Sequence, residues 1–116
     1  MVEVDEDRFE ELVAAALDEI PDELASRLDN VVVTVRSGRR TGALLGKYEG
    51  VPLTAREDYG GGLAAMPDRI TIYRLPICDA CETEEEIVEQ VRITVVHEVA
   101  HHFGIDDDRL HELGWA

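Results

Sequence analysis

Apolar residues near the start of the chain recur every three or four positions, with acidic residues between them. That spacing places the apolar side chains on one helical face; they are Phe9, Leu12, Val13, Ala16, Leu17 and Ile20. Pro21 either ends this helix or opens a short second helix that carries Leu24 and Leu28 on one side. The pattern therefore predicts an amphipathic N-terminal helix that packs on a core.

The middle of the chain has the pattern of β-structure. Residues 31–36, with the sequence VVVTVR, are β-branched and apolar enough for a buried strand. The glycines within residues 37–42 predict a turn, and residues 43–48 are a candidate hairpin partner for that strand. Glycine and proline are frequent in residues 49–67, so we expect most of this stretch to be irregular, with a short extended piece at 51–53.

A further strand is predicted at residues 68–75. Ile70 and Ile72 alternate with polar and aromatic residues, as in a strand that buries one face, and Pro76 closes it. We therefore expect a small twisted sheet of roughly three strands.

The C-terminal third predicts a long buried helix. Residues 83–86 have the form of a capping box, Thr-x-x-Glu, which opens a helix. Gly104 is placed to end it as a left-handed residue, and a short helix follows at about residues 107–113 with Asp106 as its N-cap. The buried stripe of the long helix comprises Ile87, Val88, Val91, Val95, Val96 and Val99.

Composition and charge narrow the class of protein. The 116 residues are enough for one ordinary domain, which we assign to residues 1–116 as a whole. The 26 acidic residues against 11 basic ones give a net charge of −15, which argues against nucleic acid or an anionic membrane as partner. The acidic start and the lack of a long apolar run predict a cytoplasmic protein.

One motif carries recognisable chemistry: His97-Glu98-Val99-Ala100-His101, which is HExxH. Residues four apart on a helix share a face, so His97 and His101 can present ring nitrogens to one metal ion. Glu98 projects about 100° around the helix axis from His97, close enough to reach a water on the metal without being a ligand.

Two imidazoles leave zinc short of a protein ligand, and the sequence offers a third. Gly104 tolerates positive φ, so the chain can turn there and bring Asp107 back toward the metal. His111 is a competing third ligand, because a short helix would place it on the same side as Asp107. Two imidazoles and a carboxylate suit Zn²⁺ and leave one position open, which is typical of catalytic sites.

The span HEVAHHFGIDDDRLHELG resembles the mini-zincins, small zincin-like metallopeptidases with the pattern HExxHxxGxxD. The upstream pieces LLGKYEGVPLTAR and PDRITIYR are also similar to that family, so the likeness covers about residues 44–114. The resemblance implies that His97, His101 and Asp107 are zinc ligands and that Glu98 is the catalytic base. It also implies a minimal zincin-like α+β fold, in which a small mixed sheet packs against the active-site helix and an N-terminal helix.

The wider motif is similar to that of the metzincins, with Asp107 where most carry a third histidine, and the chain ends nine residues later without a Met-turn. With this ligand set the expected reaction is amide hydrolysis of a peptide or protein, in which Glu98 activates a water on zinc. We expect small or extended substrates, which could add as a strand to an exposed sheet edge. A rival from another class is a zinc-stabilised binding module that turns over nothing.

Several other residues have open roles. Tyr59, Tyr73 and His111 are candidates for stabilising the oxyanion, although a packed ring is the plainer interpretation of each tyrosine. His102 lies about 100° from the metal face, which makes it a surface or supporting residue. We interpret Cys78-Asp-Ala-Cys81 as a loop with reduced thiols or a local disulfide; a thiolate closing the fourth zinc position is the remaining alternative.

Overall fold

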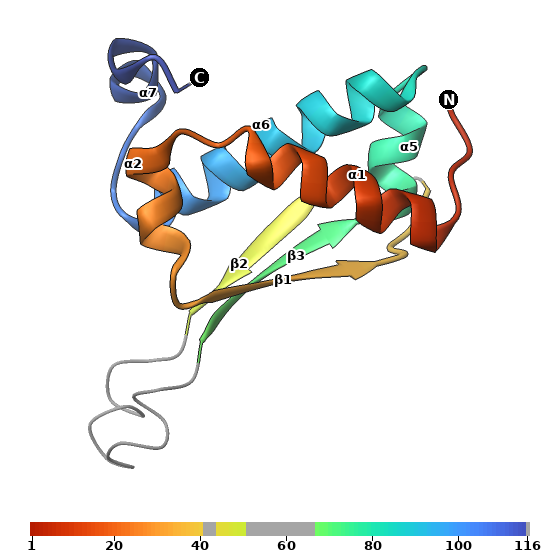
Figure 1. Ribbon diagram of the computed structural model, residues 1–116, viewed down its shortest axis with the longest axis horizontal. Helices are drawn as coiled ribbons and strands as arrows, with labels where there is room; N and C mark the ends of the chain where they lie inside the picture. Colours follow the sequence, from red (N-terminus) through yellow and green to blue (C-terminus); the bar gives the residue numbers. More distant parts are fainter. Residues whose placement is uncertain (41–43, 51–66, 116) are drawn as a thin grey trace.

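The computed structural model describes residues 1–40, 44–50 and 67–115, which form two layers (Figure 1). The order of elements is α1 (Glu6–Asp18), α2 (Asp22–Ala25), the 3₁₀ turn η1 (Ser26–Leu28), β1 (Val31–Arg36), β2 (Gly46–Glu49), β3 (Asp68–Tyr73), α5 (Arg74–Ala80), α6 (Glu84–His102) and α7 (Asp107–Leu113). Helices α1 and α6 pack against each other over one face of a three-stranded sheet. The predicted α+β fold with a small mixed sheet is confirmed. None of the helices in these ranges is both long and apolar enough to cross a bilayer.

The sheet has the strand order β1-β3-β2, so the predicted hairpin between residues 31–36 and 43–48 is wrong. β2 instead pairs antiparallel with β3, with Gly46 opposite Ile72, and β1 pairs parallel with β3, with Val33 opposite Ile70. β3 takes the centre, paired on both edges, and its residues Ile70, Thr71 and Ile72 are buried in succession. β2, the next strand along the chain, therefore lies at the edge of the sheet opposite β1.

The strand β1 is an edge strand and not the buried strand that its composition predicted. All six of its residues are half-buried or exposed, and the Val32 side chain is 43% exposed. Its β-branched residues still favour an extended backbone, because that preference reflects fit to a pleated surface as well as burial. The predicted irregular stretch lies mostly outside the described residues, at 51–66.

The prediction that β3 continues to Leu75 and is closed by Pro76 is also wrong. β3 ends at Tyr73, and Arg74–Ala80 form helix α5. Proline is tolerated here because it stands in the first helical turn, where a backbone N–H has no helical acceptor to lose. The expected cysteine loop is consequently helical: Cys78 lies in α5 and Cys81 is its C-cap.

Helix α6 is the central element of the core. Thr83 caps it by accepting a hydrogen bond from the Glu86 backbone N–H at 3.1 Å, which confirms the predicted start. Burial against α1, β2, β3 and α5 compensates for the low intrinsic helix propensity of its valines. β2 packs so closely on α6 that a Cβ at Gly46 would lie 2.6 Å from the Thr94 Cγ2 atom. The buried residues of α6 are Ile87, Val91, Thr94, Val95, Val96, Val99 and Ala100.

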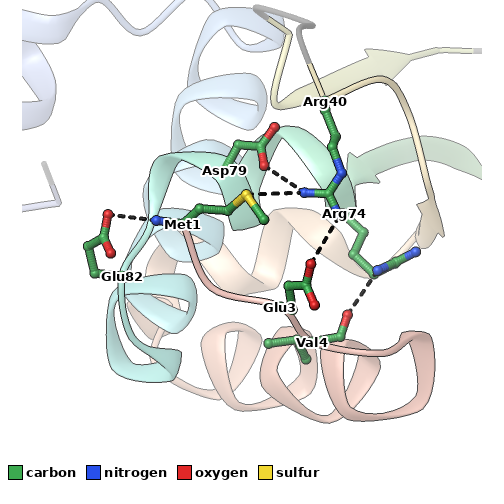
Figure 2. Close-up of polar contacts among 7 residues, drawn as sticks. All are labelled: Met1, Glu3, Val4, Arg40, Arg74, Asp79 and Glu82. Atoms are coloured by element: carbon green, nitrogen blue, oxygen red, sulfur yellow. Dashed lines mark hydrogen bonds and ion pairs between the residues drawn. The ribbon is translucent and has the colours of Figure 1, made fainter.

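The segment before α1 lies across α5 and is tied down by polar contacts (Figure 2). Arg40 bonds Asp79 at 2.9 Å and pairs with Glu3 at 3.9 Å, and Arg74 donates to the Val4 carbonyl at 2.9 Å. The Val2 N–H donates to the Cys78 carbonyl at 3.1 Å. These contacts fix the end of the molecule at which α6 begins.

Candidate metal centre

The last two turns of α6 present the HExxH side chains at the surface. The rings of His97 and His101 lie side by side, with centroids 6.2 Å apart and an interplanar angle of 26°. His97 is half-buried and His101 is exposed, whereas Val99 and Ala100 between them are fully buried. The apolar positions thus anchor the helix while the histidine face remains accessible.

The turn after α6 follows the predicted course. Gly104 has φ +74°, its N–H donates to the His101 carbonyl, and the Ile105 N–H donates to the Ala100 carbonyl at 2.8 Å. This pair of bonds is a Schellman motif, which satisfies the terminal carbonyls and reverses the chain. A Cβ at Gly104 would meet no atom within 4 Å, so glycine is needed there for its backbone conformation and not for space.

The reversal brings Asp107 back to the histidine face. Asp106 caps α7 by accepting from the Arg109 N–H at 2.9 Å, which confirms its predicted role, and Leu110 is fully buried in the core. With α7 anchored in this way, Asp107 Oδ1 lies 4.0 Å from His97 Nε2. The chain reversal therefore places the carboxylate beside one of the two imidazoles.

The donor set fits zinc by chemistry and placement, without converging on one point in this structure. Two ligands of one tetrahedral zinc lie about 3.4 Å apart, given metal–ligand distances of roughly 2.0–2.2 Å. The 4.0 Å separation of His97 and Asp107 is close to that value, and the Asp107 side chain is 68% exposed and able to rotate. Within the described ranges, no three histidine, cysteine or acidic side chains are gathered tightly enough to bind a metal. His101 and Asp107 are exposed, so both side chains have room to rotate about the fixed backbone.

Glu98 and the neighbouring charges suit a cation. Glu98 is half-buried, and it makes no ion pair or hydrogen bond with another residue that the structure describes. Asp106, Asp107 and Asp108 follow in the turn and the start of α7, whereas the nearby cation Arg109 is paired with Glu112 at 2.9 Å. The local field therefore favours a positively charged ligand.

The competing third ligand is less well placed. His111 lies in the last turn of α7 and is exposed. In the described part of the chain it makes no ring contact or ion pair with His97 or His101, whereas Asp107 approaches His97 directly. The geometry thus favours Asp107.

The cysteines lie at the opposite end of α6 and cannot reach the histidines. Fourteen helical residues separate Thr83 from His97, which is about 21 Å along the axis. Cys78 and Cys81 are both unbonded and buried, and burial raises the pKa of each thiol, with Glu86 adding to the effect at Cys81. The expectation of reduced thiols agrees with the structure, and the alternative of a thiolate on the zinc is excluded by distance.

Of the candidate oxyanion residues, Tyr73 is also remote. Tyr73 ends β3 and packs beside Gly38, where an added Cβ would lie 3.0 Å from the Tyr73 Cβ. The other end of β3, at Asp68, is the one that meets the last turn of α6. Five residues of extended strand, about 16 Å, separate Tyr73 from Asp68. Tyr73 therefore has the packed ring that is the plainer interpretation. Tyr59 lies outside the described residues.

The sequence did not reveal a set of contacts behind His102. Its ring stacks on Tyr48 with centroids 4.1 Å apart, and its Nε2 atom lies 3.8 Å from Asp68 Oδ2. His102 therefore points to the sheet and away from His97 and His101, as its helical angle predicted. No local pattern links three residues so distant in sequence; only the pairing of β2 with β3 brings Tyr48 and Asp68 together.

Comparison with known proteins places this arrangement in a family. No curated protein sequence matches the chain. The fold is similar to the solved structure of a conserved hypothetical protein, TTHA0227, from Thermo thermophilus, with a TM-score of 0.57 and 24% identity over 84% of this chain and 92% of that one. The family described as "Zincin-like metallopeptidase" matches residues 18–115. This range includes the three strands of the sheet and the whole of α6, which carries the HExxH motif. The chain belongs to the zincin-like metallopeptidase family.

Proposed function

We propose that this protein is a zinc-dependent peptidase that hydrolyses amide bonds with Glu98 as the proton-transferring base. The observation that carries the proposal is the return of Asp107 to 4.0 Å from His97, on the face that His97 shares with His101. Membership of the zincin-like metallopeptidase family supports the same reaction class.

His97, His101 and Asp107 would hold the ion, and the fourth position would remain open for water or substrate. Zinc bound there supplies a Lewis acid that polarises the scissile carbonyl and makes water more acidic. The ligands come from one rigid helix and an anchored turn, so the protein contributes their fixed spacing.

Glu98 would move the proton. Its position next to His97 in the helix places the carboxylate about 100° from the ligand direction, beside the open position and not in it. The carboxylate would accept a proton from the attacking water and then pass that proton to the leaving amine.

The substrate would be an extended peptide. β2 is an edge of the sheet and packs directly on α6, so its outer edge runs beside the helix that carries the histidines. A peptide added there as a strand would bond through its backbone, which requires little specificity in its side chains.

The rival interpretation, a zinc-stabilised binding module, has less support. The buried core includes residues from α1, α6 and the sheet, while His101 and Asp107 are exposed. A metal needed for folding usually organises a chain that lacks such a core. Here the packed core positions the candidate ligands, whereas in a zinc-stabilised module the bound metal would organise the fold.

The test compares wild type, Glu98→Gln and Glu112→Gln, each loaded with zinc and incubated with a peptide library. We expect Glu98→Gln to retain one zinc per chain and to lose about 10²–10⁴-fold in cleavage rate. Glu112→Gln, which changes an exposed glutamate of α7, should cleave normally. Equal cleavage by all three proteins, or no cleavage by wild type that binds zinc, would contradict the proposal.

A further inference from the structure

The residues from His101 onward have little burial to hold them. His101, His102, Phe103 and Gly104 are all exposed, although Val99 and Ala100 just before them are fully buried. Exposed helix ends fray, since the last residues lose few contacts when they unwind. Fraying here would displace His101 and the turn that leads to Asp107.

A continuous row of side chains crosses this turn, and we call it the aromatic clamp: Arg27, Phe103, His102, Tyr48 and Asp68. The Arg27 guanidinium lies 5.2 Å from the centre of the Phe103 ring, and the Phe103 ring meets the His102 ring edge-on at 5.1 Å and 87°. The His102 ring also stacks on the Tyr48 ring at 4.1 Å and 21°. The Tyr48 hydroxyl donates to Asp68 Oδ2 at 2.7 Å.

The sheet is shaped to receive the His102 ring. A Cβ at Gly50 would lie 3.2 Å from His102 Cε1, tighter than ordinary contact, so the bare backbone after β2 leaves the ring its space. Asp68 opens β3, and its side chain is only 16% exposed. The clamp thus joins η1, the end of α6 and the neighbouring ends of β2 and β3. In Figure 1 the end of α6 and these strand ends lie on the left of the molecule.

We propose that the aromatic clamp positions His101 for the metal by preventing the last turn of α6 from unwinding. This inference rests on the proposed zinc site, but the clamp's effect on the helix end does not. His102 is a positioning residue: it follows His101 directly, and its ring is held by the sheet while the His101 ring lies beside that of His97. If only a fraction of molecules has the turn formed, the apparent zinc affinity falls by that fraction.

The first set of variants is His102→Ala, which removes the ring, and His102→Phe, which restores a flat ring without nitrogen. Two readouts are needed: zinc affinity by competition with a chromophoric chelator, and hydrogen exchange of the Phe103, Gly104 and Ile105 amides in metal-free protein. We expect His102→Ala to weaken zinc about tenfold and to speed exchange of those amides about tenfold, with His102→Phe close to wild type.

Tyr48→Leu removes the ring from the sheet side, and Tyr73→Leu is its matched control, since both tyrosines are half-buried on strands of the same sheet. Tyr48→Leu should reproduce the His102→Ala result, and Tyr73→Leu should leave the three amides unchanged.

The outcomes separate the two proposals. If wild type binds no zinc, the proposed function fails, and amide exchange alone decides the clamp. If His102→Phe loses zinc as fully as His102→Ala, the nitrogen and not the ring is what matters, and the clamp is wrong. Unchanged exchange in both His102→Ala and Tyr48→Leu would also overturn it.

Discussion

The two ends of α6 are held in different ways. The first turn is capped by Thr83, joined to α1 by a paired Arg8 and Glu84, and followed by fully buried Ile87. The last turn buries Val99 and Ala100 but exposes His101 and His102, is followed by a left-handed glycine, and meets the sheet through His102. Core packing therefore reaches both ends, but the residues from His101 onward depend on a few specific contacts.

This difference separates stability from chemistry along one helix. Groups that bind a metal must remain accessible, so the turn that carries them cannot be covered by the core. The buried face of α6 provides the rigid base, and the more accessible face near its C-terminal end carries His97, Glu98 and His101. Substitutions at the two ends should accordingly change different measured quantities.

The largest expected effect is on the buried end. Phe9 of α1 is fully buried, and Phe9→Ala should lower the free energy of unfolding by about 3–5 kcal/mol, much of what a small domain has. Urea unfolding measures the change. The matched variant Phe103→Ala alters an exposed ring at the other end, 42% accessible, and should shift unfolding far less. Equal losses in the two variants would remove the distinction between the ends.

The second effect is on the exposed end alone. Asp107→Ala should weaken zinc binding by more than about a hundredfold, beyond the range for residues that only support a ligand. Unfolding of the metal-free protein should hardly change, because the side chain is 68% exposed. Equilibrium dialysis with elemental analysis measures zinc binding in each variant. His111→Ala is the control and should retain zinc. Retention in Asp107→Ala with loss in His111→Ala would identify the other third ligand.

The smallest effect concerns the ion pair that joins α1 to the start of α6. The Arg8 guanidinium holds the pKa of Glu84 below its ordinary value of 4.5. A lowered folded-state pKa means that the pair stabilises the protein well above pH 4.5 and that this contribution is lost as pH falls through the lowered value. Because both groups are exposed, Arg8→Gln should cause only a small, salt-sensitive fall in Tm at pH 7.

The same variant supplies its own check. At pH 3 or in 1 M salt the difference in Tm between Arg8→Gln and wild type should shrink toward zero. A difference that persists under both conditions would mean that Arg8 acts through packing of its side chain and not through charge.

Local patterns predicted the two ends of α6 and the start of α7 well, although they missed α5. The Thr83 cap, the Gly104 turn and the Asp106 cap depend on residues within one or two turns, so their physics is contained in a short stretch of sequence. The HExxH spacing likewise placed His97 and His101 together because helical geometry alone determines it.

Pairing between distant segments was not predictable in that way. The apolar strand VVVTVR looked central but lies at the edge, because strand order depends on which element covers each face and not on the strand's own composition. Pro76 suggested the end of a strand but stands in the first turn of α5, a position that equally suits proline. The contact of His102 with Tyr48 depends on the same long-range pairing.

The most direct test of the zinc site is anomalous diffraction at the zinc edge from crystals of the wild-type protein grown with zinc. The predicted result is one peak within about 2.0–2.2 Å of a ring nitrogen of His97, a ring nitrogen of His101 and a carboxylate oxygen of Asp107, with no fourth protein ligand. A peak at Cys78 and Cys81, a peak that His111 shares in place of Asp107, or no peak at the end of α6 would contradict it.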